Sequence, residues 1–598
     1  WELPPRQIIV NSVADRPALS GANCCDTGEK LPNGDAECTL RAAIEAVNAG
    51  CDDRITFAVP DVAIPKITPQ TPLPALNVKV EIDGTTQSGG KVEISGTDAT
   101  GICLDLQGGN STVRGLVINN FTGENGLGIR LFGAGKNAIV GNYLGTDVSG
   151  NVPAFNGANI IVTNSSNNEI GTTKPGEGNV IGDAVGIVGK ASTGNAIVAN
   201  RIGIGADGTS VIGRNLGIVV GGGGGTKIGG TVGAGNRIGG FSEFAIEVFG
   251  SSDTVIEGNF IGLDVPGVRA LGGAVGIVVV GINEFNDSKP TIRSNRVAGV
   301  RAGIAIVGDQ VTGATVTDNV VGPRFDGSGT LPTGVDANYA KFGIRVDGAP
   351  NVQVLRNIVT GADMNLVVAG KPQMEYNPCI DTDGDGWCET PPYLRFYSPE
   401  APFGGDEAFP PVGGVIVAAN TIGLNDKLAL PAGVKQRVGV AVYRGARDLQ
   451  IRNNIVAGHS ESDIWLRDGV RLQLMQNRIG SLDGFARNSQ VGVIVDETSD
   501  VTIAPSGSFV GNTIGFQKVA AVLVRGFATN LLVRGNQIGT GPGGAVAWPN
   551  GSGITAAGPN IIALRIENNL INGSVTHGVS LELPGNKAIL QGNRIGVS

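Results

Sequence analysis

One short segment of the sequence has the residue types and the spacing of a metal-ion loop. It reads Cys379-Ile-Asp381-Thr-Asp383-Gly-Asp385-Gly386-Trp387-Cys388-Glu389. Carboxylates at loop positions 1, 3 and 5, a Gly at position 6 and Glu389 at position 9 offer the oxygen ligands that a hard cation prefers. Without a cation these carboxylates would repel one another. The segment therefore predicts a structural Ca²⁺ site that involves Asp381, Asp383, Asp385, Trp387 and Glu389.

Position 12 of the same segment is Pro392, which cannot supply the bidentate Glu of an EF-hand. The pattern resembles instead the Asp-x-Asp-x-Asp-Gly calcium loops of thrombospondin type 3 and dockerin-like modules. An acidic, solvated turn without a metal is the alternative. We expect Cys379 and Cys388 to form a disulfide that holds the loop in place.

Other reactive side chains are sparse. The two histidines, His459 and His577, each stand alone in the sequence, which favours a turn or surface role over catalysis. No Ser-His-Asp or Cys-His arrangement stands out, and the glycine run 221–225 lacks the Lys-Ser/Thr of a phosphate-binding loop.

Four cysteines, Cys24, Cys25, Cys38 and Cys51, lie within the first 51 residues. With only two distant histidines, a zinc site is a poor fit. Disulfides in an oxidising compartment fit better, with Cys38 and Cys51 pairing with Cys24 and Cys25 in either order. Cys103 lies in a strand-like run, and we expect it to be a buried thiol.

The overall composition excludes several classes of protein. The 598 residues include 96 Gly and carry a net charge of −9, which argues against a nucleic-acid partner. No run of about 18 uncharged apolar residues is present, so we expect no membrane-spanning helix. The first residues, from Trp1 to Pro5, have no basic and apolar signal-peptide regions, and we interpret them as the start of a processed chain.

A repeat in the sequence predicts the strands that make up the fold. The phrase Asn-x-(Ile/Val/Leu)-Gly, or a near variant, recurs at steps that alternate between about 23 and about 36 residues. The marker positions are Asn142, Asn179, Asn200, Asn236, Asn259, Asn295, Asn319, Asn357, Asn420, Asn454, Asn477, Asn512, Asn536, Asn569 and Asn593. Short runs of period-two character surround each marker and predict strands. The fold class we predict is all-β: a single right-handed parallel β-helix in which the marker asparagines stack as a ladder.

The longer steps have extra residues directly after the marker, at Asp147, Asp207 and Asp264 among others. They predict a column of loops along one flank. The step of 63 residues between Asn357 and Asn420 predicts an insertion of about 40 residues. We therefore divide the chain into an N-terminal cap with disulfides (1–80), a β-helix (81–598) and, within the β-helix, an inserted calcium-binding loop (362–412).

The segment from Glu37 to Asn48 reads Glu-Cys-Thr-Leu-Arg-Ala-Ala-Ile-Glu-Ala-Val-Asn. Thr39 can cap a short helix whose Leu40, Ala43, Ile44 and Val47 share one face, and such a helix would close the end of the coil stack. With Val10-Asn-Ser-Val before it and Ile82-Asp-Gly-Thr-Thr-Gln-Ser-Gly after it, the segment resembles the CSLREA-type right-handed parallel β-helix proteins of bacteria, although Ala42 replaces the Glu of that signature. The resemblance implies a secreted or cell-surface protein.

The positions that face outward on the Gly-Ile-x-Val strands decide between an enzyme and a structural protein. Hydrolysis of a polysaccharide needs two carboxyl groups about 5–10 Å apart. Acidic outward positions occur singly, and pairing at the surface accounts for the two candidate pairs, Arg345/Asp347 and Arg467/Asp496. The low aromatic content of 5% argues against a platform on which sugars stack, although Tyr443 with Trp465 could form a small one. Most other outward positions are aliphatic, which predicts a face covered by the long loops or by another copy.

The sequence thus favours an extracellular structural β-helical protein in a cell-surface layer, fibre or adhesive assembly. The alternatives are a polysaccharide lyase or glycoside hydrolase of the β-helix type, and a non-catalytic carbohydrate-binding adhesin. The partners expected are further copies of the chain, end to end or side by side, or a cell-surface polysaccharide.

Overall fold

The computed structural model describes residues 7–20, 24–96, 101–123, 125–231, 233–281, 289–322, 342–371, 374–377, 393–396, 413–425, 427–430, 436–480, 489–504 and 511–596. The chain divides into two compact units. Unit 1 comprises Trp1–Ala274 and Asn377–Tyr393, and unit 2 comprises Val275–Tyr376 and Leu394–Ser598.

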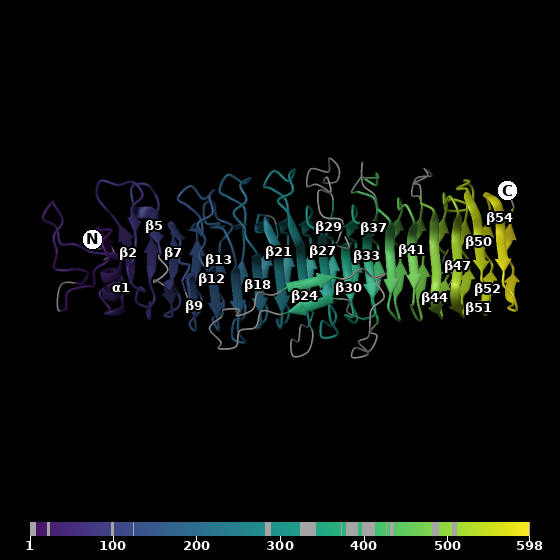
Figure 1. Cartoon of the computed structure of the whole chain (residues 1–598), viewed down its shortest axis with the longest axis horizontal. Helices are drawn as coiled ribbons and strands as arrows, with labels where there is room; N and C mark the ends of the chain where they lie inside the picture. Colours follow the sequence, from purple (N-terminus) through teal and green to yellow (C-terminus); the bar gives the residue numbers. More distant parts are fainter. Residues whose placement is uncertain are drawn as a thin grey trace, which may run out of the picture. The chain divides into compact units, whose positions relative to one another are not determined.

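Both units are built from short parallel strands that turn at Gly and Asn residues, and Figure 1 shows these strands as closely stacked arrows. One coil of the chain contributes one strand to each of three sheets, which we call sheets 1, 2 and 3. Because the next coil pairs with it in the same order, each sheet grows by one parallel strand per coil, at about 4.8 Å per strand.

In unit 1 the strands of each sheet pair in chain order. Sheet 1 contains β1 (Ile8–Val10), β2 (Arg54–Phe57), β4 (Glu81–Asp83), β7 (Thr112–Arg114), β10 (Ala138–Val140), β13 (Glu169–Ile170), β16 (Ala196–Ile197), β19 (Lys227–Gly229) and β22 (Val255–Glu257). Sheet 2 contains β3 (Lys66–Ile67), β5 (Val92–Ser95), β8 (Leu116–Asn119), β11 (Tyr143–Leu144), β14 (Val180–Ile181), β17 (Arg201–Ile202), β20 (Arg237–Ile238) and β23 (Phe260–Ile261). Sheet 3 contains β6 (Ile102–Leu106), β9 (Leu127–Phe132), β12 (Ala158–Thr163), β15 (Val185–Val188), β18 (Leu216–Gly221) and β21 (Phe241–Phe249).

In unit 2 the same three sheets recur. Sheet 1 contains β25 (Thr291–Arg293), β28 (Thr315–Thr317), β31 (Gln353–Leu355), β36 (Ile416–Ala418), β39 (Gln450–Arg452), β42 (Gln473–Met475), β45 (Thr502–Ile503), β48 (Leu532–Arg534), β52 (Leu564–Glu567) and β55 (Ala588–Gln591). Sheet 2 contains β26 (Arg296–Val297), β29 (Val320–Val321), β32 (Ile358–Val359), β37 (Thr421–Ile422), β40 (Ile455–Val456), β43 (Arg478–Ile479), β46 (Thr513–Ile514), β49 (Gln537–Ile538), β53 (Leu570–Ile571) and β56 (Arg594–Ile595).

Sheet 3 of unit 2 contains β24 (Gly273–Val280), β27 (Ala302–Val307), β30 (Phe342–Asp347), β33 (Met364–Ala369), β38 (Val438–Tyr443), β41 (Ser462–Arg467), β44 (Val491–Ser499), β47 (Ala520–Thr529), β50 (Asn550–Ala557) with β51 (Asn560–Ile562), and β54 (Ser574–Glu582). A separate two-stranded sheet joins β34 (Met374–Asn377) and β35 (Tyr393–Phe396).

The marker asparagines form the predicted ladder. In unit 1 the side chain of Asn200 accepts from the backbone N–H and the amide of Asn179, at 3.0 and 2.9 Å, and its own amide donates to Asn236 and to the carbonyl of Ile170. The same bonds repeat in unit 2, for example from Asn454 to Asn477 at 3.0 Å. Because every ladder side chain satisfies buried backbone groups of an adjacent coil, the asparagines fix how the coils stack.

The interior of each unit is a stack of aliphatic side chains. Ile181, Ile202 and Ile238 lie at one register position of sheet 2 in unit 1 and are fully buried. The fold class predicted from the repeat, an all-β right-handed parallel β-helix with a short N-terminal capping helix, is confirmed. The helix is α1 (Leu40–Asn48), followed later by the single 3₁₀ turn η1 (Gly84–Thr86) of the described residues. Among those residues no helix is both long enough and apolar enough to cross a bilayer.

Candidate functional site

The N-terminal motif builds a cap. Thr39 accepts the N–H of Ala42 and begins α1, whose predicted apolar face is buried. Arg41 donates to both carboxylate oxygens of Asp15, at 2.8 and 3.0 Å, and also to the backbone carbonyls of residues 71 and 72. Glu45 accepts the N–H of Ala18 at 2.7 Å. These polar side chains tie the helix to neighbouring segments, so the motif acts in folding.

The cysteines of the cap support part of the predicted pairing. Cys25 and Cys38 form a disulfide, whereas Cys24 and Cys51 are present as thiols. Cys103 is a buried thiol, as predicted, and burial raises the pKa of that thiol well above its usual value. Cys379 and Cys388 lie outside the described residues.

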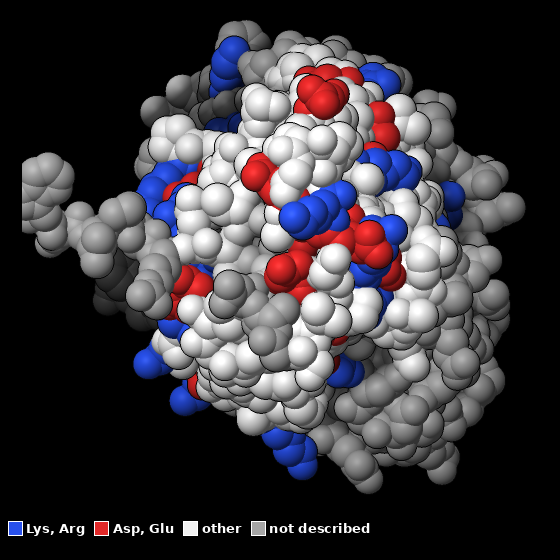
Figure 2. All heavy atoms as spheres, turned by 90° about the vertical axis from the view of Figure 1, so that its left-hand side faces the viewer, with Lys and Arg blue, Asp and Glu red and all other residues white. Residues whose placement is uncertain are grey.

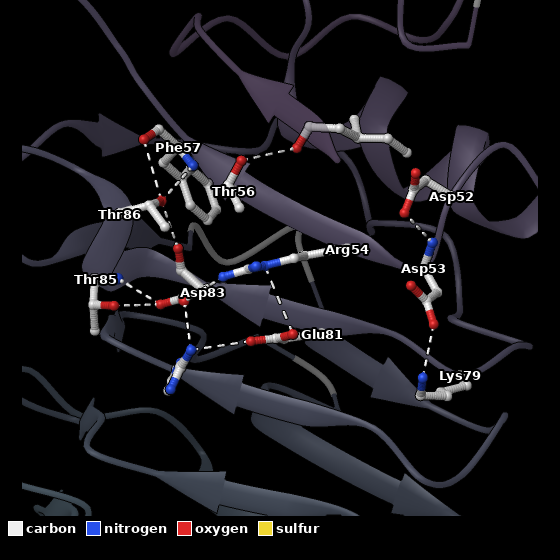
Figure 3. A network of polar contacts seen from close by, with 12 residues as sticks. Asp52, Asp53, Arg54, Thr56, Phe57, Lys79, Glu81, Asp83, Thr85 and Thr86 are labelled. Atoms are coloured by element: carbon white, nitrogen blue, oxygen red, sulfur yellow. Dashed lines mark hydrogen bonds and ion pairs between the residues drawn. The ribbon is translucent and has the colours of Figure 1, made fainter. Parts of the chain in front are cut away.

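A charged network crosses the first coils of sheet 1, on the outward side of β2, β4 and β7 (Figure 3). Asp83 accepts from Arg114 at 2.7 Å and lies 3.3 Å from Arg54, while Glu81 lies 3.0 Å from Arg114. Thr85 donates its hydroxyl and its N–H to Asp83. Burial alone would raise the pKa of the Asp83 carboxyl, but the hydrogen bonds from Thr85 and Arg114 outweigh it and hold that pKa below its usual value.

The residues after Asp83 extend this network to the previous coil. The Thr86 hydroxyl accepts the N–H of Phe57 at 2.8 Å, and the Gln87 side chain bonds both the N–H and the carbonyl of Val59. The Asp-Gly-Thr-Thr-Gln phrase therefore fastens one coil to the next. Figure 2 shows acidic and basic side chains side by side on this end of unit 1, which is the pattern that mutual pairing produces.

The loop column predicted from the longer repeat steps is present in unit 1. Antiparallel bridges close its loops at Thr146 with Pro153, at Ile204 with Val211 and at Leu263 with Ala270. Each loop turns around an Asp side chain that accepts the backbone N–H groups of its own loop, at Asp147, Asp207 and Asp264.

The carboxylates of these aspartates are already hydrogen-bonded within their own loops. The hydrogen bonds from Ser210 and Thr209 lower the pKa of the Asp207 carboxyl to about 2. Successive loops also touch, since the N–H of Asp207 donates to the Asn151 side chain at 2.9 Å. The column is thus an ordered structural edge, and within the described ranges no cluster of three or more His, Cys, Asp or Glu side chains could hold a metal ion.

The predicted calcium ligands Asp381, Asp383, Asp385, Trp387 and Glu389 lie outside the described residues. The calcium site therefore stays a prediction.

The outward face of sheet 3 in unit 2 is covered from β24 to β38, as the aliphatic stripe predicted. Val278, Ala305 and Ala441 are fully buried, so the chain itself covers this face without a second copy. Arg345 and Asp347 are also fully buried and form an ion pair at 2.6 Å. Their pairing agrees with the prediction, but the location differs, because the pair is enclosed and does not lie on the surface.

The residues of the second candidate pair, Arg467 and Asp496, form ion pairs with other partners. Arg467 and Asp496 are register neighbours on β41 and β44. Arg467 nevertheless pairs with Glu497 at 3.6 Å, and Asp496 pairs with Arg525 at 3.2 Å. Strand register placed the two residues together correctly, but their long side chains reach other partners.

Tyr443 and Trp465 do not form the small stacking platform that the sequence left open. Tyr443 and Trp465 have ring centroids 6.0 Å apart, but the rings are tilted by 57° and the residues are only 2% and 6% exposed. Arg525 covers the Trp465 ring at 5.6 Å. A sugar needs an open, flat ring face to stack on, and this pair offers none.

Among the described residues of unit 2, the carboxyl group of Asp468 is accessible and has a raised pKa. Asp468 follows β41 and is exposed. Partial burial is the main cause that raises the pKa of its carboxyl, and the charge of Glu497 adds to it, while Arg467 and Arg444 oppose it. A raised pKa moves a carboxyl toward the range of a general acid, and the nearby arginines would attract an anionic substrate.

His459 was missed as a polar centre. Its Nδ1 lies 2.7 Å from Asp463, and its Nε2 lies 2.9 Å from the amide of Asn365. Ser489 and Gln517 also donate to Asp463, and His459 is fully buried. The prediction of a lone turn or surface residue is therefore wrong for His459: it stabilises the interior of unit 2, out of reach of a polymer.

The comparisons with known proteins assign no family. No protein-family model matches the sequence, and no curated protein matches it. Among solved structures, the chain is similar to the A-module of the mannuronan C-5 epimerase AlgE6 of Azotobacter vinelandii, at 10% identity, 94% coverage of each chain and a TM-score of 0.33.

Two further structures show a similar chain path. Tailspike protein 3 of bacteriophage CBA120 gives 9% identity, with 88% of this chain and 61% of that chain covered and a TM-score of 0.37. A PL6 alginate lyase in complex with a trisaccharide gives 12% identity, with 74% and 85% covered and a TM-score of 0.30. At these identities and TM-scores the likenesses carry no argument about what this chain does.

Proposed function

We propose that the chain is an extracellular structural protein whose β-helical coils contribute to a cell-surface layer, fibre or adhesive assembly. The observation that supports this best is the pairing of charges between adjacent coils. Outward carboxylates bond to the arginine of a neighbouring coil in unit 1, as in Asp105 with Arg130, and in unit 2, as in Asp318 with Arg356.

The pairing of these carboxylates with arginine argues against a role in catalysis by proton transfer. A general acid or base must exchange a proton with its substrate, and an Arg partner bound to both oxygens of a carboxylate blocks that exchange. Both pairs named above are of this bidentate kind, with distances of 2.8 and 2.9 Å. Cross-coil pairs of this sort fix the stacking, which is what a rigid structural element needs.

Localisation and partners follow from the same proposal. A secreted or cell-surface location is supported by the Cys25–Cys38 disulfide, since such bonds persist in oxidising compartments. The partners proposed are further copies of the chain or a cell-surface polysaccharide. From β24 to β38 the outward face of sheet 3 is buried, so contacts would use other surfaces.

The proposal also includes the division of the chain into a cap, a β-helix and an inserted loop. Residues 1–80 form the cap, 81–598 the β-helix and 362–412 the inserted loop that binds Ca²⁺. Sheets 1 and 2 of unit 1 already include β1, β2 and β3, so the cap also supplies strands to the first coils. Membership of the CSLREA-type proteins is supported by the structural use of Thr39, Arg41 and Glu45 in α1.

Electron microscopy of the purified protein tests the structural role. We expect ordered filaments, sheets or surface-bound layers that form at raised protein concentration and survive dilution. Incubation with a panel of neutral and anionic polysaccharides should release neither unsaturated nor reducing sugars. Monodisperse particles at every concentration, together with sugar release, would overturn the proposal.

A second function, polysaccharide lyase or hydrolase, is favoured by Asp468 alone. If sugar release is seen, Asp468→Asn should abolish it, because the amide cannot donate the proton. Asp448→Asn is the matched control: Asp448 is exposed in the same unit and pairs with Arg471 at 2.6 Å. Equal activity in the two variants would exclude Asp468 as the acid.

A further inference from the structure

The N-terminal cap of unit 1 contains a hollow of about 520 Å³ that is lined by four cysteines. Two of them, Cys25 and Cys38, are joined as a disulfide. The other two, Cys24 and Cys51, line the same hollow as thiols. Because the four sulfur-bearing residues share one small volume, the second pair is placed next to the first.

We propose that Cys24 and Cys51 are the site of a second disulfide, which ties the turn at Cys24 to the end of α1. The two residues line one hollow together with the bonded pair Cys25–Cys38, and the Cys51 thiol is sensitive to the charge of Cys24. The backbone N–H of Cys51 donates to the carbonyl of Ala46 in the last turn of α1, at 3.0 Å, and this bond fixes the position of Cys51. Cys24 is fixed by its neighbour Cys25, whose disulfide leaves it little freedom.

The chemistry requires an oxidant, which a protein or small-molecule disulfide of the oxidising compartment supplies. Cys24 is exposed and attacks the acceptor disulfide as a thiolate, forming a mixed disulfide and releasing one acceptor thiol. Cys51 then attacks the Cys24 sulfur and releases the second acceptor thiol. The two cysteines lose two protons and two electrons in total, and the acceptor disulfide is reduced to two thiols.

The order of these steps follows from the contact between the thiols. The interaction with the Cys24 thiol, partial burial and the charges of Cys24 and Asp52 raise the pKa of Cys51 to about 11, so Cys51 stays protonated at neutral pH. Once Cys24 is in the mixed disulfide, its negative charge is gone and it no longer raises the pKa of Cys51. Cys51 can then lose its proton and complete the bond.

The proposal selects one of the two connectivities that the sequence left open. Since Cys25 is bonded to Cys38, the remaining pair is Cys24 with Cys51, separated by 27 residues, from 51 − 24. The crossed alternative, Cys24 with Cys38 and Cys25 with Cys51, would need the observed bond to be broken. The proposal does not depend on the structural function proposed above.

Peptide mapping without reduction tests the connectivity. Free thiols are blocked with N-ethylmaleimide in denaturant at acidic pH, and the secreted full-length protein is then digested with trypsin. Cleavage after Arg6, Lys30, Arg41 and Arg54 gives peptides 7–30, 31–41 and 42–54, because the Arg16–Pro17 bond resists trypsin. We expect one species in which all three peptides are joined and no maleimide on any of them.

Variants separate the outcomes. In Cys24→Ser, peptide 42–54 should be released with one maleimide on Cys51 while 7–30 and 31–41 stay joined. The crossed pairing would instead keep 7–30 joined to 42–54. Cys103→Ser is the matched control and should leave the three-peptide species unchanged. Release of maleimide-labelled 42–54 from the wild-type protein, or the crossed pattern in Cys24→Ser, would overturn the proposal.

Discussion

The asparagine ladder of unit 1 gives a sharp test of what holds the coils together. Asn236 is fully buried, and its side chain makes four hydrogen bonds. Its oxygen accepts from the backbone N–H and the amide of Asn200 at 3.0 and 3.1 Å. Its amide donates to the carbonyl of Ile197 at 2.8 Å and to Asn259 at 2.9 Å. The substitution Asn236→Ala removes all four and leaves a buried N–H without its acceptor.

The size of the effect follows from these bonds. Each lost hydrogen bond in a buried site costs about 1 kcal/mol, and an unsatisfied buried group costs about 1–3 kcal/mol. We therefore expect Asn236→Ala to lower the free energy of unfolding of unit 1 by about 4 kcal/mol, which is a large share of the roughly 5–15 kcal/mol of a typical domain. Asn215 is the matched control, because it is exposed in the same unit and bonds only to Ser242 and through its backbone.

Urea unfolding followed by far-UV circular dichroism measures the difference. With a slope of about 3 kcal/mol per molar urea, the Asn236→Ala midpoint should fall by about 1 M or more. Asn215→Ala should change stability by less than about 0.5 kcal/mol. Hydrogen exchange should show the loss of protection centred on β17 and β20. Equal midpoints for the two variants would refute the argument that the ladder, and not only aliphatic packing, stabilises the stack.

Three further predictions concern the cap, the first coils and the inserted loop. Arg41→Ala should loosen α1 by about 1–3 kcal/mol, because Asp15 loses its bidentate partner, and limited proteolysis should then cut near residue 41 first. The pKa values of Asp83 and Glu37 are lowered, so they contribute stability above their unfolded-state values of about 3.9 and 4.3, and this is lost as pH falls through the folded values. The urea concentration at the unfolding midpoint of the wild type should therefore fall when the pH is lowered below about 4. In Asp83→Asn the midpoint should fall less over the same pH range. Calorimetric titration of the chelated protein should reveal a Ca²⁺ site tighter than millimolar that Asp383→Ala removes, and no such site would exclude the calcium loop.

The repeat made the fold predictable because each marker asparagine recurs once per coil in a fixed place. A second ladder was missed, although its signal is in the sequence. Asn137, Asn168 and Asn195 also stack through their side chains in unit 1, at 2.9 and 2.8 Å. In Asn137-Ala-Ile-Val-Gly and in Asn195-Ala-Ile-Val-Ala the first residue of the run is the ladder residue, whereas the repeat phrase marks only the Asn that follows the run.

The polar contacts between coils were harder to predict. The partners of His459 include Asn365, which lies 94 residues earlier, and Ser489, which lies 30 residues later. Only the exact register of several coils places these side chains together. The repeat does not predict that register, because the irregular step of 63 residues between Asn357 and Asn420 interrupts it. Arg467 shows the remaining difficulty: its strand neighbour was correct, but the rotamer of a long side chain decides which carboxylate it reaches.

The same contacts also limit where an activity could reside. A catalytic group must be both accessible and free to change its protonation state. The interior polar groups, such as His459 and Asp463, are fully buried, and the buried Arg345–Asp347 pair is enclosed as well. The cross-coil carboxylates are held by arginines, as Asp105 is by Arg130, and that arginine must move away before the carboxylate can exchange a proton. Among the described residues of unit 2, Asp468 meets both conditions, so a failure of Asp468→Asn to alter any observed turnover would remove the structural support for catalysis there.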